Sequence, residues 1–207
     1  MALKFMQIAL TPDVQAAEDR YFGRHHAVAG APERDDLTEG EAAFIARRDS
    51  FYIATVNADG WPYLQHRGGP AGFLKVLSPH LLGFADLKGN RQLLTTGNLT
   101  GDDRVTLFLM DYPQGERLKI LGHARVVDAR ENVKLADQLS PSPELRGKIE
   151  RVFLVEVVSY DWNCSQYITP RYTVEEMEEV IGPLKRRIAE LEERVLEGGG
   201  GDRRRLS

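Results

Sequence analysis

Cysteine is almost absent from this sequence, which contains Cys164 and no second one among its 207 residues. A lone cysteine cannot form an intrachain disulfide or build a cysteine-rich metal site. Because no second thiol could resolve an oxidised Cys164, we interpret it as a small buried residue rather than a redox centre. The absence of disulfides fits a reducing compartment, so we expect a cytoplasmic protein whose core is supplied by its 42% hydrophobic residues.

Long apolar runs are missing as well. No stretch approaches the roughly 18 apolar residues that a membrane-spanning helix needs, and the N-terminal MALKFMQIAL is too weakly apolar to predict a signal peptide. The formal net charge of −4 provides no overall attraction to nucleic acid or to anionic lipid. We therefore expect neither a membrane nor a nucleic acid as partner.

Several common site motifs are also lacking. The sequence contains no G-x-x-x-x-G-K-[ST] phosphate loop, no dinucleotide-binding G-x-G-x-x-G and no G-x-S-x-G nucleophile elbow. Its five histidines lack metal-ligand spacing, since the neighbours His25 and His26 would point to different faces of a helix. We expect no metal site.

Strand-like runs dominate the middle of the chain. FYIATVN and WPYLQHR flank the turn residues Asn57–Gly60 and predict a hairpin. FLKVL and LLGFAD are expected to pair next, followed by RVTLFLM, RLKILGHARVVD with a bend at Gly122, and VFLVEVVSYDW. Because the connections are short and hold few helices, the pattern favours a six-stranded antiparallel barrel over a parallel sheet. The predicted class is mainly β with peripheral helices.

Helices are predicted at the margins of this barrel. DVQAAEDRYFGRHH, within residues 1–36, is amphipathic and fits a peripheral helix. Thr38 and Glu41 form a T-x-x-E capping box, which predicts a helix that ends near Asp49. A further helix is expected over residues 129–139.

The C-terminal pattern changes from Thr173 onward to apolar residues three or four positions apart. These residues are Val174, Met177, Ile181, Leu184, Ile188, Leu191 and Val195. The heptad-like stripe predicts a helix over 173–197, kinked at Gly182-Pro183. Both a dimer-packing arm and a helix packed on its own barrel fit this stripe. GGGGDRRRLS predicts a flexible tail over 198–207.

Two basic patches are candidates for a binding site. The first, Gln65–Gly69, interrupts a strand just before a proline. In the second, LKGNRQLLTTGNL, we expect a turn at Lys88–Asn90 to open a short helix that holds Arg91 and stops at Gly97. A helix N-terminus and an arginine fork both suit a phosphate, so neighbouring strands would let the two patches converge on one anion. Taken alone, Arg67 also fits a surface residue at a strand end.

The strings QHRGGPAGFLKV, GNRQLLTTGNL, LFLMDYP, RLKILGHARVV and WNCSQYITPRYT, in this order and spacing, resemble the pyridoxamine 5′-phosphate oxidase-like family of flavin-binding split β-barrels. The resemblance extends from about Thr38 to Tyr172. It implies a homodimer of split barrels with FMN at the subunit interface. The expected organisation is an N-terminal extension over 1–36, an FMN-binding split barrel over 37–172, the helix over 173–197 and the tail.

The resemblance also implies roles for individual residues. The stretch that starts at Gln65 would pass over the flavin, with glutamine where the family has an arginine, and its backbone N–H groups would face the ring. The family's Ser-Arg-Lys phosphate turn falls on Gly89–Arg91. The implied cofactor-binding residues are Gln65, His66, Arg67, Gly68, Gly69, Phe84, Ala85, Asn90, Arg91, Arg117 and Trp162, with Lys75 as a further phosphate candidate. Gln166 and Arg171 are expected in the substrate pocket.

The function implied is that of an FMN-dependent oxidoreductase acting on a small organic substrate. Because the cofactor carries the redox chemistry, we assign no catalytic side chain. The ending Ile168–Tyr172 lacks the family's substrate-recognising arginine pattern, so pyridoxamine phosphate is not the expected substrate. The alternatives are a non-catalytic flavin-binding redox or stress sensor, and the same barrel binding a deazaflavin or haem, with His66 or His123 as the haem ligand.

Overall fold

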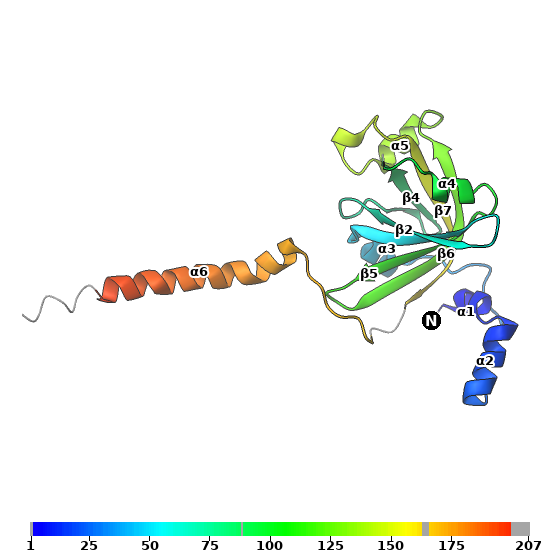
Figure 1. Ribbon diagram of the computed structural model, residues 1–207, viewed down its shortest axis with the longest axis horizontal. Helices are drawn as coiled ribbons and strands as arrows, with labels where there is room; N and C mark the ends of the chain where they lie inside the picture. Colours follow the sequence, from blue (N-terminus) through cyan, green and yellow to red (C-terminus); the bar gives the residue numbers. More distant parts are fainter. Residues whose placement is uncertain (1, 88, 163–165, 200–207) are drawn as a thin grey trace, which may run out of the picture. The chain divides into compact units, whose positions relative to one another are not determined.

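Antiparallel strands form the body of the protein (Figure 1). A computed structural model describes residues 2–87, 89–162 and 166–199, so Lys88, Cys164 and most of the expected tail lie outside the described residues. The strands are β1 (Ser50–Val56), β2 (Pro62–Gly68), β3 (Lys75–Ser78), β4 (Leu81–Asp86), β5 (Arg104–Asp111), β6 (Glu116–Asp128) and β7 (Arg151–Trp162). The predicted mainly β class with a C-terminal helix is confirmed.

The helices lie before, between and after these strands. They are α1 (Leu3–Ala9), α2 (Pro12–Phe22), α3 (Glu39–Ala46), α4 (Leu94–Asn98), α5 (Val133–Leu139) and α6 (Val174–Gly199), with a short 3-10 turn at Pro143–Leu145. The sheet and all helices except α6 belong to one compact unit, and α6 belongs to a second. Among the described helices, none combines the length and the apolarity needed to cross a membrane.

The strand order corrects two expectations. Seven strands follow one another in the order β2-β1-β5-β6-β7-β4-β3, so the predicted count of six is wrong. Each of the seven strand-like runs in the sequence forms a strand, including the short β3, which pairs with β4 as expected for FLKVL and LLGFAD. The sheet is also open, because among the described residues β2 and β3 form its two edges. Pro70 follows β2 and has no N–H group to donate, which helps to end the ladder there.

The hairpin of β1 and β2 forms as predicted. Its strands pair from Val56 with Pro62 to Ser50 with Gly68. In the turn, the Asn57 side chain accepts hydrogen bonds from two backbone N–H groups, and Gly60 adopts a φ of 83° that favours glycine. β1 then alternates buried and half-buried side chains, as expected for a strand with one face on a core.

Aromatic rings fill the centre of the curled sheet. Phe84 of β4 and Phe153 of β7 stack at 4.9 Å between ring centroids with an interplanar angle of 5°. Phe51 of β1 meets Phe84 edge-on at 5.2 Å and stacks on Phe73 at 5.5 Å. All four rings are buried. Because each fully buried ring contributes roughly 1.5–3 kcal/mol, this cluster stabilises the approach of β1 to β4 and β7.

Helix α3 is anchored to the end of β7 by one carboxylate. Glu41 accepts hydrogen bonds from the Thr38 backbone N–H at 2.9 Å and from the Trp162 indole N–H at 2.7 Å. The predicted capping box is therefore confirmed, although α3 ends at Ala46 rather than near Asp49. Burial raises the pKa of Glu41, but the hydrogen bonds from Thr38 and Trp162 outweigh burial and leave the pKa below its usual value of 4.5.

Gly122 marks an irregularity in the long strand β6, where a bend was expected. The register between β6 and β7 shifts between Leu121 and Gly122. A Cβ atom built on Gly122 would lie 2.4 Å from the backbone oxygen of Glu156. The glycine thus permits an approach of β7 that any side chain would block.

We expect Gly122→Ala to lower the free energy of unfolding by about 1–3 kcal/mol, because the added methyl group must displace the backbone of β7. Gly97→Ala is the matched control, since a Cβ atom there meets nothing within 4 Å. Urea unfolding followed by far-ultraviolet circular dichroism measures both. Equal stability of the two variants would contradict the close approach at Gly122.

We expect Glu41→Gln to lower the free energy of unfolding at pH 7 by about 1–2 kcal/mol, because the charge-assisted hydrogen bonds are weakened. A carboxyl whose pKa is lower in the folded than in the unfolded protein stabilises the fold at pH values above its unfolded pKa. This stabilisation is lost as the pH falls through the folded pKa. The difference in unfolding free energy between Glu41→Gln and the native protein should therefore shrink below pH 4.5. Glu39→Gln removes a charge from the same helix turn and should leave the pH profile unchanged. A difference in unfolding free energy that does not shrink as the pH falls below 4.5 would refute this role for Glu41.

Candidate functional site

A small cleft opens where β2, β4 and β7 approach one another. Its lining includes Gln65 and Arg67 of β2, Asp86 at the end of β4, and the loop of residues 89–93 with Asn90 and Arg91. Glu150 and Arg151, at the start of β7, complete it, and its volume is about 60 Å³. The two predicted basic patches thus contribute to one cleft.

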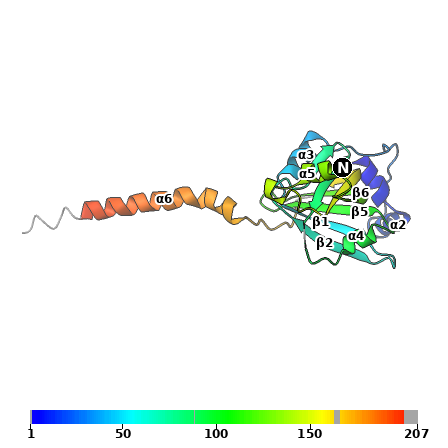
Figure 2. The ribbon, with the colours of Figure 1, turned by 90° about the horizontal axis from the view of Figure 1, so that it is seen from above.

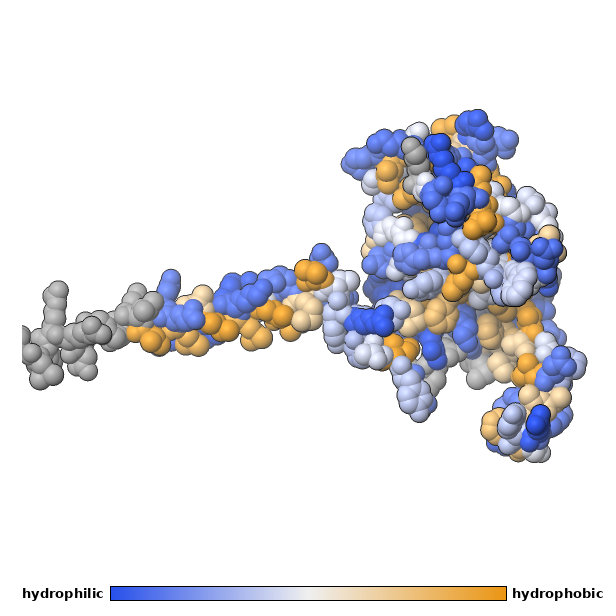
Figure 3. Space-filling model, viewed as in Figure 1, coloured by the Kyte–Doolittle hydropathy of each residue, from blue (hydrophilic) through white to orange (hydrophobic). Residues whose placement is uncertain are grey.

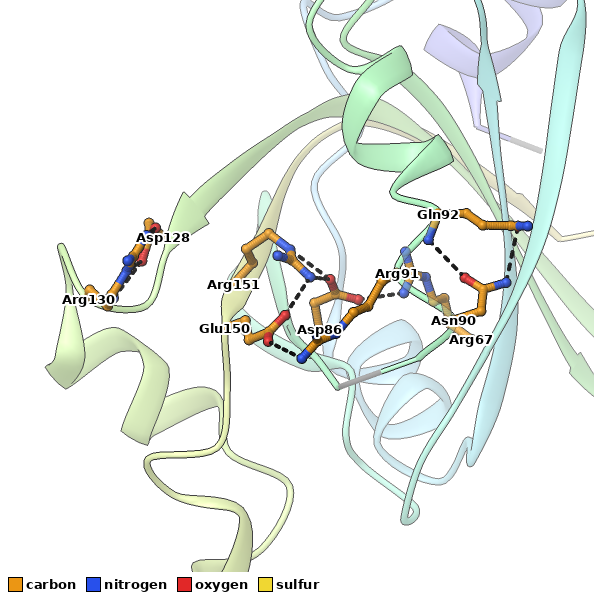
Figure 4. Close-up of polar contacts among 9 residues, drawn as sticks. All are labelled: Arg67, Asp86, Asn90, Arg91, Gln92, Asp128, Arg130, Glu150 and Arg151. Atoms are coloured by element: carbon orange, nitrogen blue, oxygen red, sulfur yellow. Dashed lines mark hydrogen bonds and ion pairs between the residues drawn. The ribbon is translucent and has the colours of Figure 1, made fainter.

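The charges in this cleft alternate along a chain of five side chains, which Figure 4 shows. Asp86 lies between Arg67, at 2.7 Å, and Arg151, at 2.9 Å. Arg151 also contacts Glu150 at 3.2 Å, and Glu150 contacts Arg91 at 3.7 Å. Three guanidinium groups against two carboxylates leave one net positive charge. The cleft can therefore attract an anion, although none of its arginines lacks a carboxylate partner.

Arg67 is a structural residue as well as a lining residue. Its guanidinium lies 5.1 Å from the ring centroid of Phe153 and 5.9 Å from that of Phe84. Only 17% of its side chain and 8% of that of Asp86 are exposed, so this pair is largely withdrawn from water. The Nε atom of Arg67 is buried without a hydrogen-bond partner. A buried donor in this position fits an acceptor such as a phosphate oxygen.

The loop before α4 differs from the prediction. α4 begins at Leu94, so Arg91 precedes the helix, and the expected helix start around Asn90 is wrong. Arg91 and Leu93 both have positive φ angles, of 62° and 57°. This left-handed backbone, uncommon for residues other than glycine, prevents helical hydrogen bonds through Arg91. The side chain of Arg91 remains 64% exposed.

Two hydrogen bonds hold α4 beside the first hairpin, where Figure 2 shows it. The Thr95 hydroxyl donates to the Gln65 side-chain oxygen at 2.6 Å. The Asn98 amide donates to the Thr55 hydroxyl at 2.8 Å, and Thr55 and Thr95 are both buried. Gln65, expected at the flavin, is therefore engaged in positioning the helix that follows the cleft loop.

His66 and the two glycines of the first patch do not line the cleft. Residues alternate between the two faces of a strand, so His66 lies on the opposite face from Gln65 and Arg67 and packs edge-on against Tyr52 at 5.5 Å. Gly68 still pairs with β1. The Gly69 N–H donates to the Asp49 carbonyl at 2.8 Å, and a Cβ atom on Gly69 would lie 2.8 Å from the Phe73 ring. The break in β2 is explained by this packing.

Three further candidates, Phe84, Ala85 and Lys75, make their contacts within the fold. Phe84 belongs to the aromatic core, and Ala85 lies in a second apolar cluster with α5. The Lys75 ammonium donates to the Gln138 carbonyl at 2.5 Å, at the C-terminal end of α5. A cation there complements the helix dipole. None of these three residues lines the cleft.

Arg117 and Trp162 lie at the other end of the sheet. Trp162 pairs with Leu118, next to Arg117, whereas the cleft residue Arg151 begins the same strand β7. At about 3.3 Å per residue, the strand between Arg151 and Trp162 is roughly 36 Å long, so the two groups lie at opposite ends of β7. Trp162 is 38% exposed, and the Arg117 Nε atom is buried without a hydrogen-bond partner. Within one chain the cofactor candidates thus form two groups.

The expected substrate residues Gln166 and Arg171 belong to different compact units, so their joint pocket stays a prediction. Gln166 is exposed. The Arg171 guanidinium lies 5.0 Å from the ring centroid of Tyr112, within the unit that contains α6.

Sequence reasoning missed the acidic half of the cleft. Asp86 closes the apolar run LLGFAD, and Glu150-Arg151 opens the apolar run of β7. Charged residues that directly border apolar strands were the available signal. Their pairing across β4 and β7, where Asp86 is opposite Arg151, depends on strand order and could not be read from the chain.

A second cleft, of about 460 Å³ and mostly apolar, lies over β1, β5 and β6 beside α1. His123 lines it, with its Nδ1 atom 2.8 Å from an Asp103 carboxylate oxygen. Within the described ranges, no three metal-ligating side chains are grouped closely enough to hold a metal ion.

Solved structures similar to this chain include HupZ from Group A Streptococcus, with 13% identity over 66% of this chain and 99% of that chain and a TM-score of 0.49. General stress protein 26 from Bacillus anthracis shares 13% identity, covering 59% of this chain and 91% of that chain, at a TM-score of 0.45. An F420 reductase shares 18% identity, and the similarity covers 60% of this chain and 98% of that chain at a TM-score of 0.42.

No curated protein sequence is significantly similar to this chain. The sequence pattern of the family described as pyridoxamine 5′-phosphate oxidase, in contrast, matches residues 37–155, which is more than half of the 207 residues. The match covers α3 and strands β1 to β6 and reaches into β7. It includes every segment that lines the small cleft with Arg67, Arg91 and Arg151. The chain therefore belongs to the pyridoxamine 5′-phosphate oxidase family.

Proposed function

We propose that the protein binds FMN and acts as an FMN-dependent oxidoreductase on a small organic substrate. The observation that carries this proposal is the convergence of Arg67, Arg91 and Arg151 on one cleft in a chain of this family. Guanidinium groups match the geometry of phosphate oxygens. The unpartnered Nε atom of Arg67 and the net positive charge of the cleft fit a phosphate group.

The dimensions of the cleft limit what it holds. Sites that enclose a whole cofactor usually measure about 300–1,000 Å³, whereas this cleft measures about 60 Å³. The cleft thus suits the phosphate end of FMN, with Arg91 and the Asn90 amide as its more exposed donors. The flat ring system requires a second surface.

A homodimer would provide that surface. In a two-fold symmetric pair, each copy offers the same patch to the other. The second group of candidates, Arg117 at the start of β6 and Trp162 at the end of β7, lies too far from the cleft of its own chain to serve it. Placed against the cleft of a second copy, the half-exposed Trp162 ring would pack on the flavin, and the unpartnered Arg117 Nε atom would gain an acceptor.

Bound FMN would supply hydride and single-electron transfer. The residues of the chain would bind the phosphate, orient the ring and exclude water, so no side chain need act as an acid or a base. Pyridoxamine phosphate is not the proposed substrate, because the C-terminal segment lacks the arginine pattern that the family uses for it.

A haem protein is the second candidate, supported by one observation. His123 lines the larger apolar cleft and contacts Asp103, which would fix the orientation of the imidazole if it held a haem iron. The visible absorption spectrum of the purified protein separates the candidates, since flavin and haem have different bands. A haem spectrum lost in His123→Ala would replace the FMN proposal.

We expect the protein to bind FMN at least about tenfold more tightly than riboflavin, because riboflavin lacks the phosphate that the arginines would hold. Quenching of flavin fluorescence during titration measures both dissociation constants. Equal affinity for the two flavins would contradict phosphate binding in this cleft, and no affinity for either would refute the flavin proposal.

We expect Arg91→Gln to weaken FMN binding by about 10- to 100-fold while leaving riboflavin binding unchanged. Arg91 suits this test because its exposed side chain is not needed for folding, unlike that of Arg67. Arg130→Gln is the matched control: Arg130 also pairs with a carboxylate, that of Asp128, but lies apart from the cleft (Figure 4). An equal effect of both substitutions would show that Arg91 acts only through overall charge.

A further inference from the structure

Helix α6 carries an apolar stripe that its own unit leaves exposed. Six of the seven stripe residues are 40–79% exposed, with Met177 the least and Val174 the most exposed of these six. Figure 3 shows apolar side chains gathered along one side of the helix. The stripe consists of Val174, Met177, Ile181, Leu184, Ile188, Leu191 and Val195. A continuous exposed apolar face of this length indicates an interaction surface.

The spacing of the stripe is that of a coiled coil. Its residues alternate three and four positions apart through three heptads, with Val174 at the first a position and Met177 at the first d position. Within residues 174–194 the b, c and f positions hold polar or small residues or Pro183, which falls at an outward-facing c position. A capping box between Thr173 and Glu176 fixes the helix start.

The residue types at the core positions indicate the number of helices in the coiled coil. The a positions hold Val, Ile, Ile and Val, all β-branched, and the d positions hold Met, Leu and Leu. β-branched residues at a combined with leucine at d favour parallel pairs of helices over trimers and tetramers. This distribution indicates a partner that is a single, parallel copy of the same helix.

The flanking charges agree with a parallel pair. In that arrangement, Arg187 at g faces Glu192 at e of the second copy, and the symmetric contact repeats on the other side. In an antiparallel pair overlapped across all three heptads, Lys185 would instead face Lys185 and Arg187 would face Arg187. Within one chain, Arg187 contacts Glu190 at 2.9 Å, and this exposed pair is weak enough to rearrange.

We propose that α6 pairs with α6 of a second copy of this chain as a parallel two-stranded coiled coil. The interface consists of the seven residues of the stripe, with Arg187 and Glu192 at its rim. None of these residues lines the cleft, so the pairing of α6 and the binding of FMN can each fail without the other.

Cysteine cross-linking in the full-length protein tests the proposal. All test proteins carry Cys164→Ser, so that the native thiol cannot react. Leu191→Cys places a thiol at a d position, where the two copies meet only in a parallel, in-register pair. Glu193→Cys places it at the neighbouring outward-facing f position. After mild oxidation, we expect at least about tenfold more disulfide-linked dimer for Leu191→Cys than for Glu193→Cys on a non-reducing gel.

A second substitution tests the apolar interface itself. Ile188→Lys, added to Leu191→Cys, introduces a charge at the adjacent a position and should reduce cross-linking to the level of Glu193→Cys. Circular dichroism should show that the β-sheet signal of the variant is unchanged. Equal cross-linking of Leu191→Cys and Glu193→Cys, or none for Leu191→Cys, would overturn the proposal in favour of an antiparallel pair, a different partner protein or packing on the chain's own barrel.

Discussion

The buried carboxylate of Asp86 is the contact on which the curled sheet depends. Four strands separate β2 from β4 in the sheet order, yet Arg67 of β2 reaches Asp86 at 2.7 Å. Arg151 binds the same carboxylate from the neighbouring strand β7. Removing one partner from such a buried pair leaves an uncompensated charge, which typically costs about 3–5 kcal/mol. Among the described residues, side chains here join two strands that are not paired through their backbones.

This arrangement makes one set of residues serve both folding and the candidate site. Arg67 stacks near Phe153 and neutralises Asp86, so its position is fixed before any ligand arrives. A pre-positioned guanidinium loses little freedom on binding an anion. Arg91, at the exposed end of the charge chain, is instead free to turn toward a ligand. The two carboxylates leave the three arginines of the cleft with one net positive charge.

Local features of the fold could be predicted because they depend on neighbouring residues. The Thr38–Glu41 capping box, the hairpin at Asn57–Gly60 and the long helix with Pro183 inside it all form as the sequence indicates. The loop at Arg91 was mispredicted, because the left-handed backbone there has no glycine to signal it. The open edges at β2 and β3 also went unforeseen, since they reflect how distant strands assemble.

The sequence by itself determined the class of fold, the family and the heptad stripe of α6, because composition, periodicity and motif order are properties of the chain. It also placed Arg67 and Arg91 among the candidates. Only the tertiary structure decided that these two share a cleft with Asp86, that His66 points away from it, and that Trp162 lies at the far end of β7. The reason is physical: strand order and curl set which distant side chains meet, and neither is encoded in any local pattern.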